Sequence, residues 1–472
     1  MDFSLFIPET YLLLLALFFF CLTLWKVSAD RIQGVALFLT AVGVVISLAA
    51  VHVSGETFYR AYRVDLFSQL FKVLICLGFF LVVLLSRKLK GIEEPLQPEF
   101  FMFFSLSALG LTILVSSVEL LTIFVAMELS SYPLYILIPM RSRSGGQPME
   151  AGIKYIIFGA AATGIMIFGM SYVFGLTQST YLADILPKMS VLLKEPVSAV
   201  GLLLILSGFF FKLAVVPLHF WTPDVYEGTA NETVSFIATL PKLAAVALML
   251  RIVSLAGAGS VNLVQALVLL AAISMTFGNL AALVQTDLKR LLAYSSIAHA
   301  GYILLGVLSL NAAGFSAAVY HITAYLLMNL ACFLVICTVS REGENVSIAD
   351  LAGLYRRSPL LAFTLAVGAF ALAGIPPTAG FTGKLFLFTA ALNQGHLALV
   401  VIAAVNTAIS IYYYLNIVRS AYGHDPDGLP EVTLSFSNRV LNFGLILVIL
   451  LLGILPTWFI DLAKTACKTI LS

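Results

Sequence analysis

Charged residues are scarce in this sequence. Only 11% of its 472 residues are Asp, Glu, Lys or Arg, whereas roughly 25% are charged in ordinary soluble domains. Apolar residues make up 61% of the chain, and its mean hydropathy is +1.03. A soluble fold of this length could not cover its surface with so few charges. The composition therefore predicts a membrane protein with many spans, and the small net charge of +2 excludes an electrostatic nucleic-acid partner.

The common cofactor and metal motifs are also missing. The five cysteines form no C-x-x-C pair, which excludes the usual iron–sulfur and zinc sites and favours small core residues as their interpretation. No G-x-G-x-x-G follows a strand-like run. The run 380–385 departs from a Walker A motif, because the required positions hold Thr378 and Leu385. We therefore expect this chain to hold no metal, nucleotide or redox cofactor of its own.

The apolar runs predict an all-α polytopic membrane protein with fourteen transmembrane helices, TM1–TM14. Each span needs about 20 mostly apolar residues. TM1 is not a cleavable signal peptide, because no basic segment precedes it and its apolar run to Trp25 is too long. The predicted spans are 5–25, 31–53, 65–86, 99–117, 119–138, 152–175, 198–221, 233–256, 261–284, 290–310, 313–339, 359–393, 397–421 and 438–461.

The spans form one integral membrane domain over residues 1–472. A β-barrel is excluded because the apolar runs are continuous rather than alternating. The longest connections lie near 87–98, 176–197, 341–358 and 422–437, and none is long enough for a soluble domain. We divide the domain into TM1–3 at 1–98, TM4–8 at 99–256, TM9–13 at 261–421, and TM14 at 438–461.

The charges of the loops predict the orientation. Fifteen Lys and Arg residues fall in or beside the odd-numbered loops, against seven in or beside the even-numbered loops and the C-terminus. Positive charge is enriched on the cytoplasmic side of membrane proteins. The odd-numbered loops are therefore expected in the cytoplasm and both termini on the outer side, as an even number of spans requires.

Four charged residues remain in the middle of predicted spans. Each costs about 2.5–3.5 kcal/mol at a helix centre, so a chain does not carry several without a use for them. They are Glu128, Lys212, Lys242 and Lys384. The alternative to a functional role is a set of buried ion pairs that hold helices together.

Two further charges lie closer to helix ends. Lys72 is about two turns into TM3, so that its ammonium group can reach the interface. Glu119 begins TM5, and its nine-residue separation from Glu128 places both carboxylates on one helix face. We include Glu119 as a candidate relay residue and leave an ion-pairing role open for both Lys72 and Glu119.

The charged residues in the spans suit proton transfer. Burial lowers the pKa of a lysine, in documented cases to about 5–6, and a nearby carboxylate raises it again. A lysine whose carboxylate neighbour approaches and recedes is therefore a proton switch near neutral pH. Arginine could not do this because it stays protonated in proteins. The mid-span bases here are lysines, together with His299 in TM10 and His321 in TM11, for which a relay role and a core role both stay open.

Prolines break two of the charged spans. TM7 contains Pro217 and Pro223 after Lys212, and TM12 contains Pro376 and Pro377 before Lys384. Proline removes a helix hydrogen bond, and irregular backbone at membrane depth is tolerated where it lines a cavity or is covered by protein. Broken helices at corresponding places in two halves are typical of transporters with inverted repeats.

We therefore predict that TM4–8 and TM9–13 are inverted five-helix repeats. Their register stays open. An offset of 172 aligns Lys212 with Lys384, and one of 171 aligns Glu128 with His299, whereas Pro217 aligns with Pro377 at an offset of 160.

Four segments carry a resemblance to a known family. They are Val125–Tyr135 (VAMELSSYPLY), Pro217–Gly228 (PLHFWTPDVYEG), Tyr294–Tyr302 (YSSIAHAGY) and Gly374–Lys384 (GIPPTAGFTGK). With them the chain resembles the subunit N family of bacterial proton-pumping NADH:quinone oxidoreductase, respiratory complex I, over nearly its whole length. The lysine at 384 and the lack of a long lateral C-terminal helix set it apart from the related subunits M and L.

The resemblance implies a role for each relay residue. Glu128 would pair with Lys212, Lys242 would relay protons in a half-channel, and Lys384 would lead to the exit or to a neighbouring subunit. The partners would be other membrane subunits of the complex, with FMN and iron–sulfur clusters in further subunits and quinone as the electron acceptor. It also implies a location in the bacterial inner membrane.

Other assemblies use the same fold. A subunit of a multi-subunit Mrp-type cation/proton antiporter is the alternative of a different class. A membrane hydrogenase, or a relative fed by ferredoxin or F420, would share the proton chemistry and differ in its electron donor. The segment 225–228 and Lys384 favour the complex I subunit.

Overall fold

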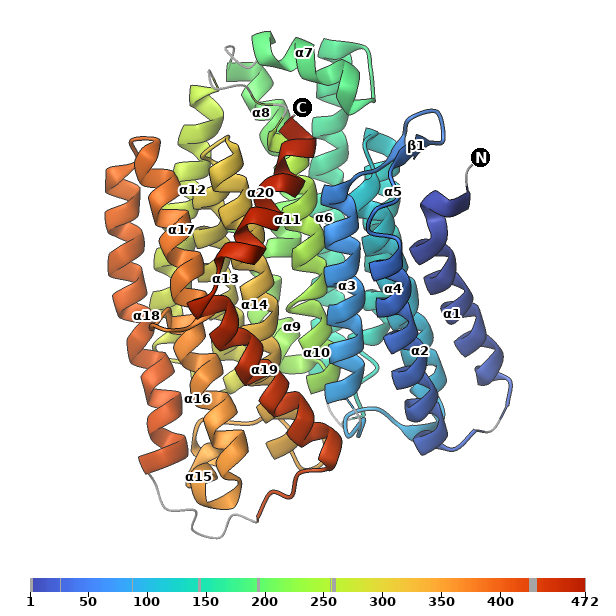
Figure 1. Cartoon of the computed structure of the whole chain (residues 1–472), viewed down its shortest axis with the longest axis vertical. Helices are drawn as coiled ribbons and strands as arrows, with labels where there is room; N and C mark the ends of the chain where they lie inside the picture. Colours follow the sequence, from blue (N-terminus) through green and yellow to red (C-terminus); the bar gives the residue numbers. More distant parts are fainter. Residues whose placement is uncertain are drawn as a thin grey trace.

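The computed structural model describes residues 3–25, 27–86, 88–142, 146–192, 196–254, 256, 260–423 and 431–471. Its helices run mostly parallel to the long axis of the molecule (Figure 1). Among the described residues, eleven helices are long and apolar enough to cross a membrane. The predicted membrane protein of apolar helices is confirmed, whereas the count of fourteen spans stays a prediction.

The N-terminal helices form one side of the bundle. They are η1 (Phe3–Phe6), α1 (Ile7–Thr23), α2 (Ala29–Ala49) and α3 (Leu66–Leu85), with a short antiparallel hairpin of β1 (Gly55–Thr57) and β2 (Tyr62–Val64) between α2 and α3. Asp65 caps α3 by accepting a hydrogen bond from the Ser68 backbone at 2.8 Å, and the buried Arg251 donates to both of its carboxylate oxygens at 3.0 Å. The sequence pattern did not predict the hairpin.

The next group of helices contains the first broken span. It comprises η2 (Glu94–Leu96), α4 (Gln97–Ser116), α5 (Leu120–Leu137), α6 (Gln147–Thr177), α7 (Leu182–Leu192), α8 (Pro196–Leu213), α9 (Trp221–Gly228), α10 (Asn231–Ile237) and α11 (Leu240–Val253). The predicted break in TM7 separates α8 from α9. The predicted TM8 is also interrupted, between α10 and α11, where Pro241 brings no N–H to the helix.

The following group repeats this order. It comprises α12 (Val261–Ala282), α13 (Leu288–Val307), α14 (Ala312–Val339), η3 (Ala349–Leu351), α15 (Leu354–Arg357), α16 (Pro359–Ala373), α17 (Ala379–Asn393) and α18 (Leu397–Gly423). The predicted break in TM12 separates α16 from α17. The predicted TM14 at 438–461 covers most of α19 (Phe436–Ile454) and only the start of a second helix, α20 (Thr457–Leu471). The two helices are separate because Pro456 cannot continue the hydrogen-bond ladder.

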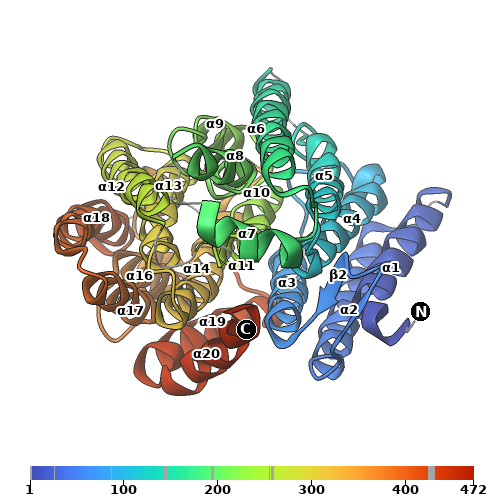
Figure 2. The same ribbon diagram turned by 90° about the horizontal axis from the view of Figure 1, so that it is seen from above.

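Two segments occupy the centre of the bundle. The segment 231–253, which holds α10 and α11, is wholly buried, and α14 is nearly so. Figure 2 shows them surrounded by the other helices. Their side chains are covered by the neighbouring helices on every side. The polar side chains of these segments therefore lie in the interior, away from lipid.

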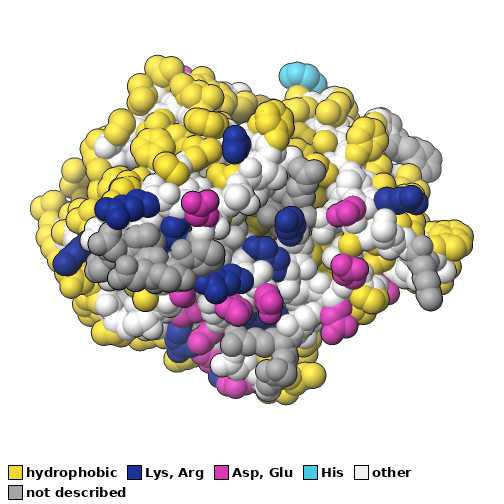
Figure 3. Space-filling model, turned by 90° about the horizontal axis from the view of Figure 1, so that it is seen from below, with side chains coloured by type: hydrophobic (Ala, Val, Ile, Leu, Met, Phe, Trp, Pro, Cys, Tyr) yellow, Lys and Arg dark blue, Asp and Glu magenta, His cyan; other side chains and the backbone are white. Residues whose placement is uncertain are grey.

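The two ends of the bundle carry the charges. We call the end at which α15 lies, the lower end in Figure 1, the α15 end. Lys, Arg, Asp and Glu side chains spread across this face, and hydrophobic side chains line much of its rim (Figure 3). The marked N- and C-termini both lie at the opposite end.

Candidate functional site

The first break places two lysines beside the end of α8. Lys212 lies in the last turn of α8, and its Nζ donates a hydrogen bond to Ser131 Oγ of α5 at 2.8 Å. Lys242 lies in the first turn of α11, and its Nζ donates to the carbonyl oxygen of Leu213 at 2.7 Å. The last carbonyls of a helix lack intrahelical partners and carry the negative end of its dipole. The broken helix thus supplies the acceptor for Lys242.

Glu128 does not touch Lys212 directly. Its Oε1 accepts a hydrogen bond from Thr163 Oγ1 of α6 at 2.7 Å, and the described residues show no ion pair between Glu128 and Lys212. Ser131 lies three residues after Glu128 on α5, on the same helix face, and its hydroxyl accepts from Lys212. The pairing of Glu128 with Lys212 that the resemblance implies stays a prediction, and in this structure Ser131 is the side chain that contacts the lysine.

The second break repeats the arrangement with one lysine. Lys384 in α17 donates from Nζ to the carbonyl oxygens of Leu372 at 3.2 Å and Ala373 at 3.0 Å, which end α16. The same ammonium group lies 4.6 Å from the centre of the Tyr302 ring. Gly374 follows with a φ of +86°, and a Cβ there would lie 3.0 Å from Lys384 Cδ. A side chain at this turn would therefore be strained and would crowd the lysine.

The two histidines lie against each other. His299 Nδ1 and His321 Nε2 are 3.2 Å apart, and the rings stack at 5.4 Å between centroids. Tyr325 of α14 lies 5.2 Å from the His299 ring. Both histidines are buried, as are Glu128 and the lysines at 212, 242 and 384, with at most 8% of any of them exposed. The pairing shows that the two histidines share a hydrogen, as either a relay or a structural bridge requires.

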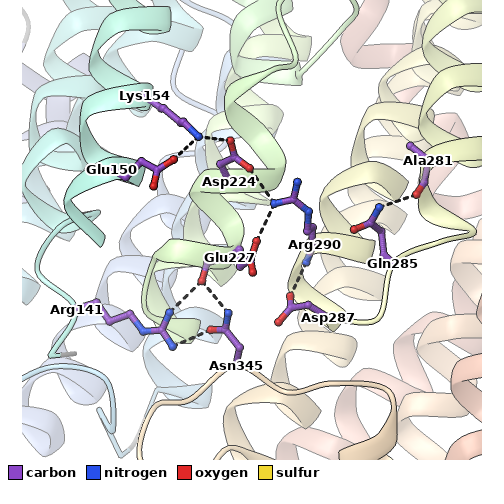
Figure 4. Close-up of polar contacts among 10 residues, drawn as sticks. All are labelled: Arg141, Glu150, Lys154, Asp224, Glu227, Ala281, Gln285, Asp287, Arg290 and Asn345. Atoms are coloured by element: carbon purple, nitrogen blue, oxygen red, sulfur yellow. Dashed lines mark hydrogen bonds and ion pairs between the residues drawn. The ribbon is translucent and has the colours of Figure 1, made fainter. Parts of the chain in front are cut away.

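A cluster of ion pairs at the α15 end joins the two groups of helices (Figure 4). Asp224 of α9 accepts from Lys154 of α6 at 2.6 Å and from Arg290 of α13 at 2.8 Å. Arg290 also pairs with Glu227 at 2.7 Å. Arg141 donates to the carbonyl oxygen of Glu227 at 3.0 Å and to the amide of Asn345. The half-helix α9 is therefore fixed between α6 and α13.

The cluster sets the charge of Asp224. Partial burial raises the pKa of this carboxyl, but the hydrogen bonds and charges of Lys154 and Arg290 outweigh burial and hold the pKa below its usual value. Asp224 is thus ionised at neutral pH. Sequence reasoning did not single out these residues, although Asp224 and Glu227 lie in the segment that carried the family resemblance.

The family model "NADH:quinone oxidoreductase/Mrp antiporter, TM" matches residues 117–410, which contain both breaks, the three lysines and the histidine pair. The chain belongs to this family. It is 52% identical over 471 residues to "NADH-quinone oxidoreductase subunit N 2" of Opitutus terrae, covering 98% of each chain. It is 48% identical over 463 residues to the protein of the same name from Solidesulfovibrio magneticus, covering 98% of this chain and 97% of that one.

Solved structures share the fold. A chain of respiratory complex I from Thermus thermophilus with bound aureothin superposes with a TM-score of 0.82 at 33% identity, covering 97% of this chain and 99% of that chain. A chain of the Mrp complex from Dietzia sp. DQ12-45-1b gives a TM-score of 0.86 at 22% identity, covering 100% and 98%. At that identity the likeness shows the fold alone.

Lys72 forms a buried ion pair, which is one of the two roles left open for it. It is fully buried, and its Nζ lies 2.9 Å from Glu9 Oε1 of α1 and donates to the Tyr62 hydroxyl at 3.1 Å. Its ammonium group therefore does not extend to the interface. The sequence analysis did not single out its partner Glu9, which lies beside Pro8 and offers a buried counter-charge.

Glu119 caps α5. Its Oε2 accepts from the backbone N–H of Thr122 at 2.7 Å and from the Thr122 hydroxyl at 2.8 Å. This accounts for an acidic residue at a helix start. A relay role for Glu119 stays a prediction.

No metal centre is visible in the part of the chain that the structure describes, since it contains no group of three or more His, Cys, Asp or Glu able to hold an ion. The five cysteines are free thiols. The buried lysines instead lie at the two helix breaks, where they donate hydrogen bonds to Ser131 and to backbone carbonyl oxygens.

Proposed function

We propose that this chain is the subunit N of a bacterial proton-pumping NADH:quinone oxidoreductase, and that it moves protons through the bilayer while partner subunits carry the electrons. The observation that carries the proposal is the set of three buried lysines at the two helix breaks, two of which bind the freed carbonyls of α8 and α16. The close relatives named as this subunit support it.

We infer fourteen spans with two inverted repeats as its architecture. Five packing contacts between helices recur in the two groups. In the first group α4 packs on α5, α6 packs on α8 and α9, and α11 packs on α4 and α8. In the second group the corresponding contacts are α12 on α13, α14 on α16 and α17, and α18 on α12 and α16. Each repeat holds five spans, and an odd number of spans turns the second repeat upside down in the membrane.

We infer that no single offset relates the two repeats. From Leu120 to Leu288, the starts of α5 and α13, the offset is 168, whereas from Leu213 to Ala373, the ends of α8 and α16, it is 160. Part of this difference arises because the connection between α13 and α14 is shorter than the one between α5 and α6. The offset of 168 aligns Glu128 with Ser296, about one turn before His299, so the alignment of Glu128 with His299 stays open.

Each residue of the site has a defined proton role in this proposal. Lys212 Nζ takes up a proton while Ser131 accepts its hydrogen bond and Glu128 lies one turn away. Lys242 Nζ receives the proton beside the α8 carbonyl, and the His299–His321 pair passes it toward Lys384 Nζ. A buried lysine alternates between charged and neutral forms when its surroundings change. The protein interior around α11 and α14 excludes bulk water from the transfer.

The electron chemistry belongs to partners. In this proposal other subunits hold the FMN and the iron–sulfur clusters, and the complex as a whole reduces quinone. This chain holds no cofactor of its own. It is placed in the bacterial inner membrane beside other antiporter-like and small subunits. The α15 end faces the cytoplasm, where the loop charges place it, and both termini face the outer side.

The second candidate is a subunit of an Mrp-type cation/proton antiporter, which the shared family model and fold favour. Co-purification separates the two. An affinity-tagged chain purified from its native membranes is expected to bring flavin- and iron–sulfur-containing subunits, together with NADH:quinone activity that the chain alone lacks. A membrane complex with cation/proton exchange and no redox subunits would contradict the proposal, and a hydrogenase or an F420- or ferredoxin-oxidising assembly would change the electron donor.

A further inference from the structure

Helices α19 and α20 leave a hollow beside α3 on the face of the bundle that is turned to the viewer in Figure 1. Both helices pack on α3 and on α14. They meet at Pro456 and run at an angle to each other, so that the chain bends away from α3 between its contacts with that helix. The space inside the bend is a groove of about 360 Å³, which we call the α19 groove.

The α19 groove is lined by apolar side chains. Leucines of α3 between positions 74 and 84 form one wall, and Val448 belongs to the opposite wall on α19. Leu326 and Leu327 of α14 form the floor and are only 1% and 6% exposed. The Thr323 hydroxyl, also on the floor, donates to a carbonyl oxygen of its own helix at 2.8 Å. An occupant would therefore meet hydrocarbon on three sides, and it must itself be apolar.

The length of the α19 groove matches one leaflet of a bilayer. Leu74 and Leu84 are ten residues apart on α3, which corresponds to about 15 Å along the helix. The hydrocarbon core of a membrane is about 30 Å thick. Leu84 lies at the end of α3 that is nearer to the α15 end, and Leu74 lies near the middle of the helix. The groove thus covers the half of the core on the side of the α15 end.

Helix α20 closes the groove on the side of the membrane centre. Trp458 and Phe459 line this end, and Arg63, just before α3, donates to the Thr469 carbonyl oxygen of α20 at 3.5 Å. The helix therefore covers the half of α3 that is farther from the α15 end. A transmembrane helix of a partner needs a face about 30 Å long, which the groove does not offer. A flexible hydrocarbon chain that enters from the leaflet at the α15 end fits the groove instead.

Two basic residues lie at the level of the head groups of that leaflet. Lys88 follows Leu84 by four residues, and Arg439 directly precedes Val440 of the groove wall; both basic side chains are exposed. Basic residues at the cytoplasmic ends of transmembrane helices attract anionic lipid head groups. The α15 end is the cytoplasmic end in the proposed orientation. The apolar groove and the two charges together match the chain and the head group of an anionic phospholipid.

We propose that the α19 groove binds one acyl chain of an anionic phospholipid from the leaflet at the α15 end, with the head group beside Lys88 and Arg439. The bound chain fills a space that the side chains leave open, and it makes the close contacts that a packed protein interior otherwise makes with itself. It thereby holds the bend between α19 and α20 against α3 and α14. No covalent bond forms or breaks, and the binding involves none of the buried lysines at the helix breaks.

Photo-crosslinking of the intact purified complex tests the occupant. The complex is placed in nanodiscs of phosphatidylethanolamine and phosphatidylglycerol, and a fraction of the phosphatidylglycerol carries a diazirine in the middle of one acyl chain. Mass spectrometry then identifies the labelled residues. We expect label on Leu326 and Leu327, which bulk lipid does not reach because they are almost fully buried. If only exposed residues of α19 are labelled, no lipid chain occupies the groove and the proposal is wrong.

A pair of neighbouring substitutions tests whether the chain enters between the walls. Val448→Trp narrows the groove, whereas Leu447→Trp is the matched control, because Leu447 is 57% exposed and lies outside the lining. We expect Val448→Trp to reduce the labelling of the floor leucines severalfold and Leu447→Trp to leave it at the wild-type level. Leu81→Trp narrows the groove from α3 and gives the same test if Val448→Trp lowers the amount of complex. Unchanged labelling of the floor in Val448→Trp and Leu81→Trp would overturn the proposal.

The choice of lipid tests the head-group contact. Phosphatidylglycerol is expected to label the floor severalfold more than phosphatidylcholine with the same diazirine chain. The double variant Lys88→Gln, Arg439→Gln should remove this preference, whereas Lys464→Gln on α20 should keep it. Equal labelling by both lipids in the wild type would contradict the assignment to an anionic lipid. These measurements detect binding rather than proton pumping, so a negative result would leave the proposed function standing.

Discussion

Ser131 offers a sharp test of the relay because its hydroxyl is the only side-chain acceptor that Lys212 contacts among the described residues. Ser131→Ala removes that acceptor and leaves the Lys212 ammonium group buried without it. Ser130 is the matched control: it is buried, adjacent, and donates to the same Met127 carbonyl as Ser131, but it does not touch the lysine.

The magnitude follows from the hydrogen bond that is lost. A hydrogen bond to a charged group contributes about 1.5–3 kcal/mol, and about 1.4 kcal/mol corresponds to a tenfold change in an equilibrium. Ser131→Ala should therefore weaken proton binding at Lys212 by roughly one to two powers of ten. When Lys212 binds its proton this much more weakly, it is protonated for a smaller fraction of the time and transfers fewer protons in each reaction cycle of the complex.

The assay compares proton uptake with electron transfer in proteoliposomes that contain the intact complex. We expect Ser131→Ala to lower the number of protons moved per NADH oxidised, and Ser130→Ala to match the wild type. A wild-type ratio in Ser131→Ala would show that this contact does not set the proton affinity of Lys212, and would refute the reasoning.

Three further predictions concern the supports of the site. Gly374→Ala forces a residue with a Cβ into a left-handed conformation, at a cost of about 1–2 kcal/mol, and its methyl group crowds Lys384. We therefore expect less assembled complex and weaker proton pumping. Gly444→Ala should be neutral, because a Cβ at this position would have no neighbouring atom within 4 Å. Lys72→Met leaves Glu9 as a buried unpaired charge at a cost of about 3–5 kcal/mol, so the amount of the chain in membranes should fall. Adding Glu9→Leu to this variant should restore that amount. If the double variant does not recover, the pairing of Lys72 with Glu9 is contradicted. Arg290→Gln should lower the melting temperature of the complex more at low salt than at high salt, because the two ion pairs of Arg290 are about one-third exposed and are screened by salt. The control Lys464→Gln, which removes an exposed ion pair, should have no effect. An equal shift of the melting temperature at both salt concentrations would argue against an electrostatic role for Arg290.

Hydropathy and proline placement predicted the helices and both breaks, since these depend on local composition and on the missing N–H of proline. The interruptions between α10 and α11 and between α19 and α20 were not predicted, because each is short and the apolar run continues through it, although Pro241 and Pro456 lie beside them. The hairpin at 55–64 holds few residues and has no apolar alternation long enough to recognise.

The buried charged residues could be predicted from the sequence one by one, whereas their contacts could not, and their role in proton transfer stays a prediction. Glu128, Lys212, Lys242 and Lys384 stand out because charge is costly in a span. That Lys242 binds the carbonyl of Leu213, or that Ser131 stands at the contact with Lys212, depends on how helices distant in the sequence pack, and hydroxyl residues in apolar helices give no signal of their own. Glu9 was missed for the same reason, because its partner Lys72 lies two helices away.

Lys212→Arg tests the central claim most directly. Arginine keeps the positive charge beside Ser131 and the end of α8 but does not release a proton. If Lys212 works by gaining and losing a proton, the variant complex should assemble and oxidise NADH while moving fewer protons per electron than the wild type. A wild-type proton-to-electron ratio in Lys212→Arg would show that the residue is a fixed charge and would contradict the account.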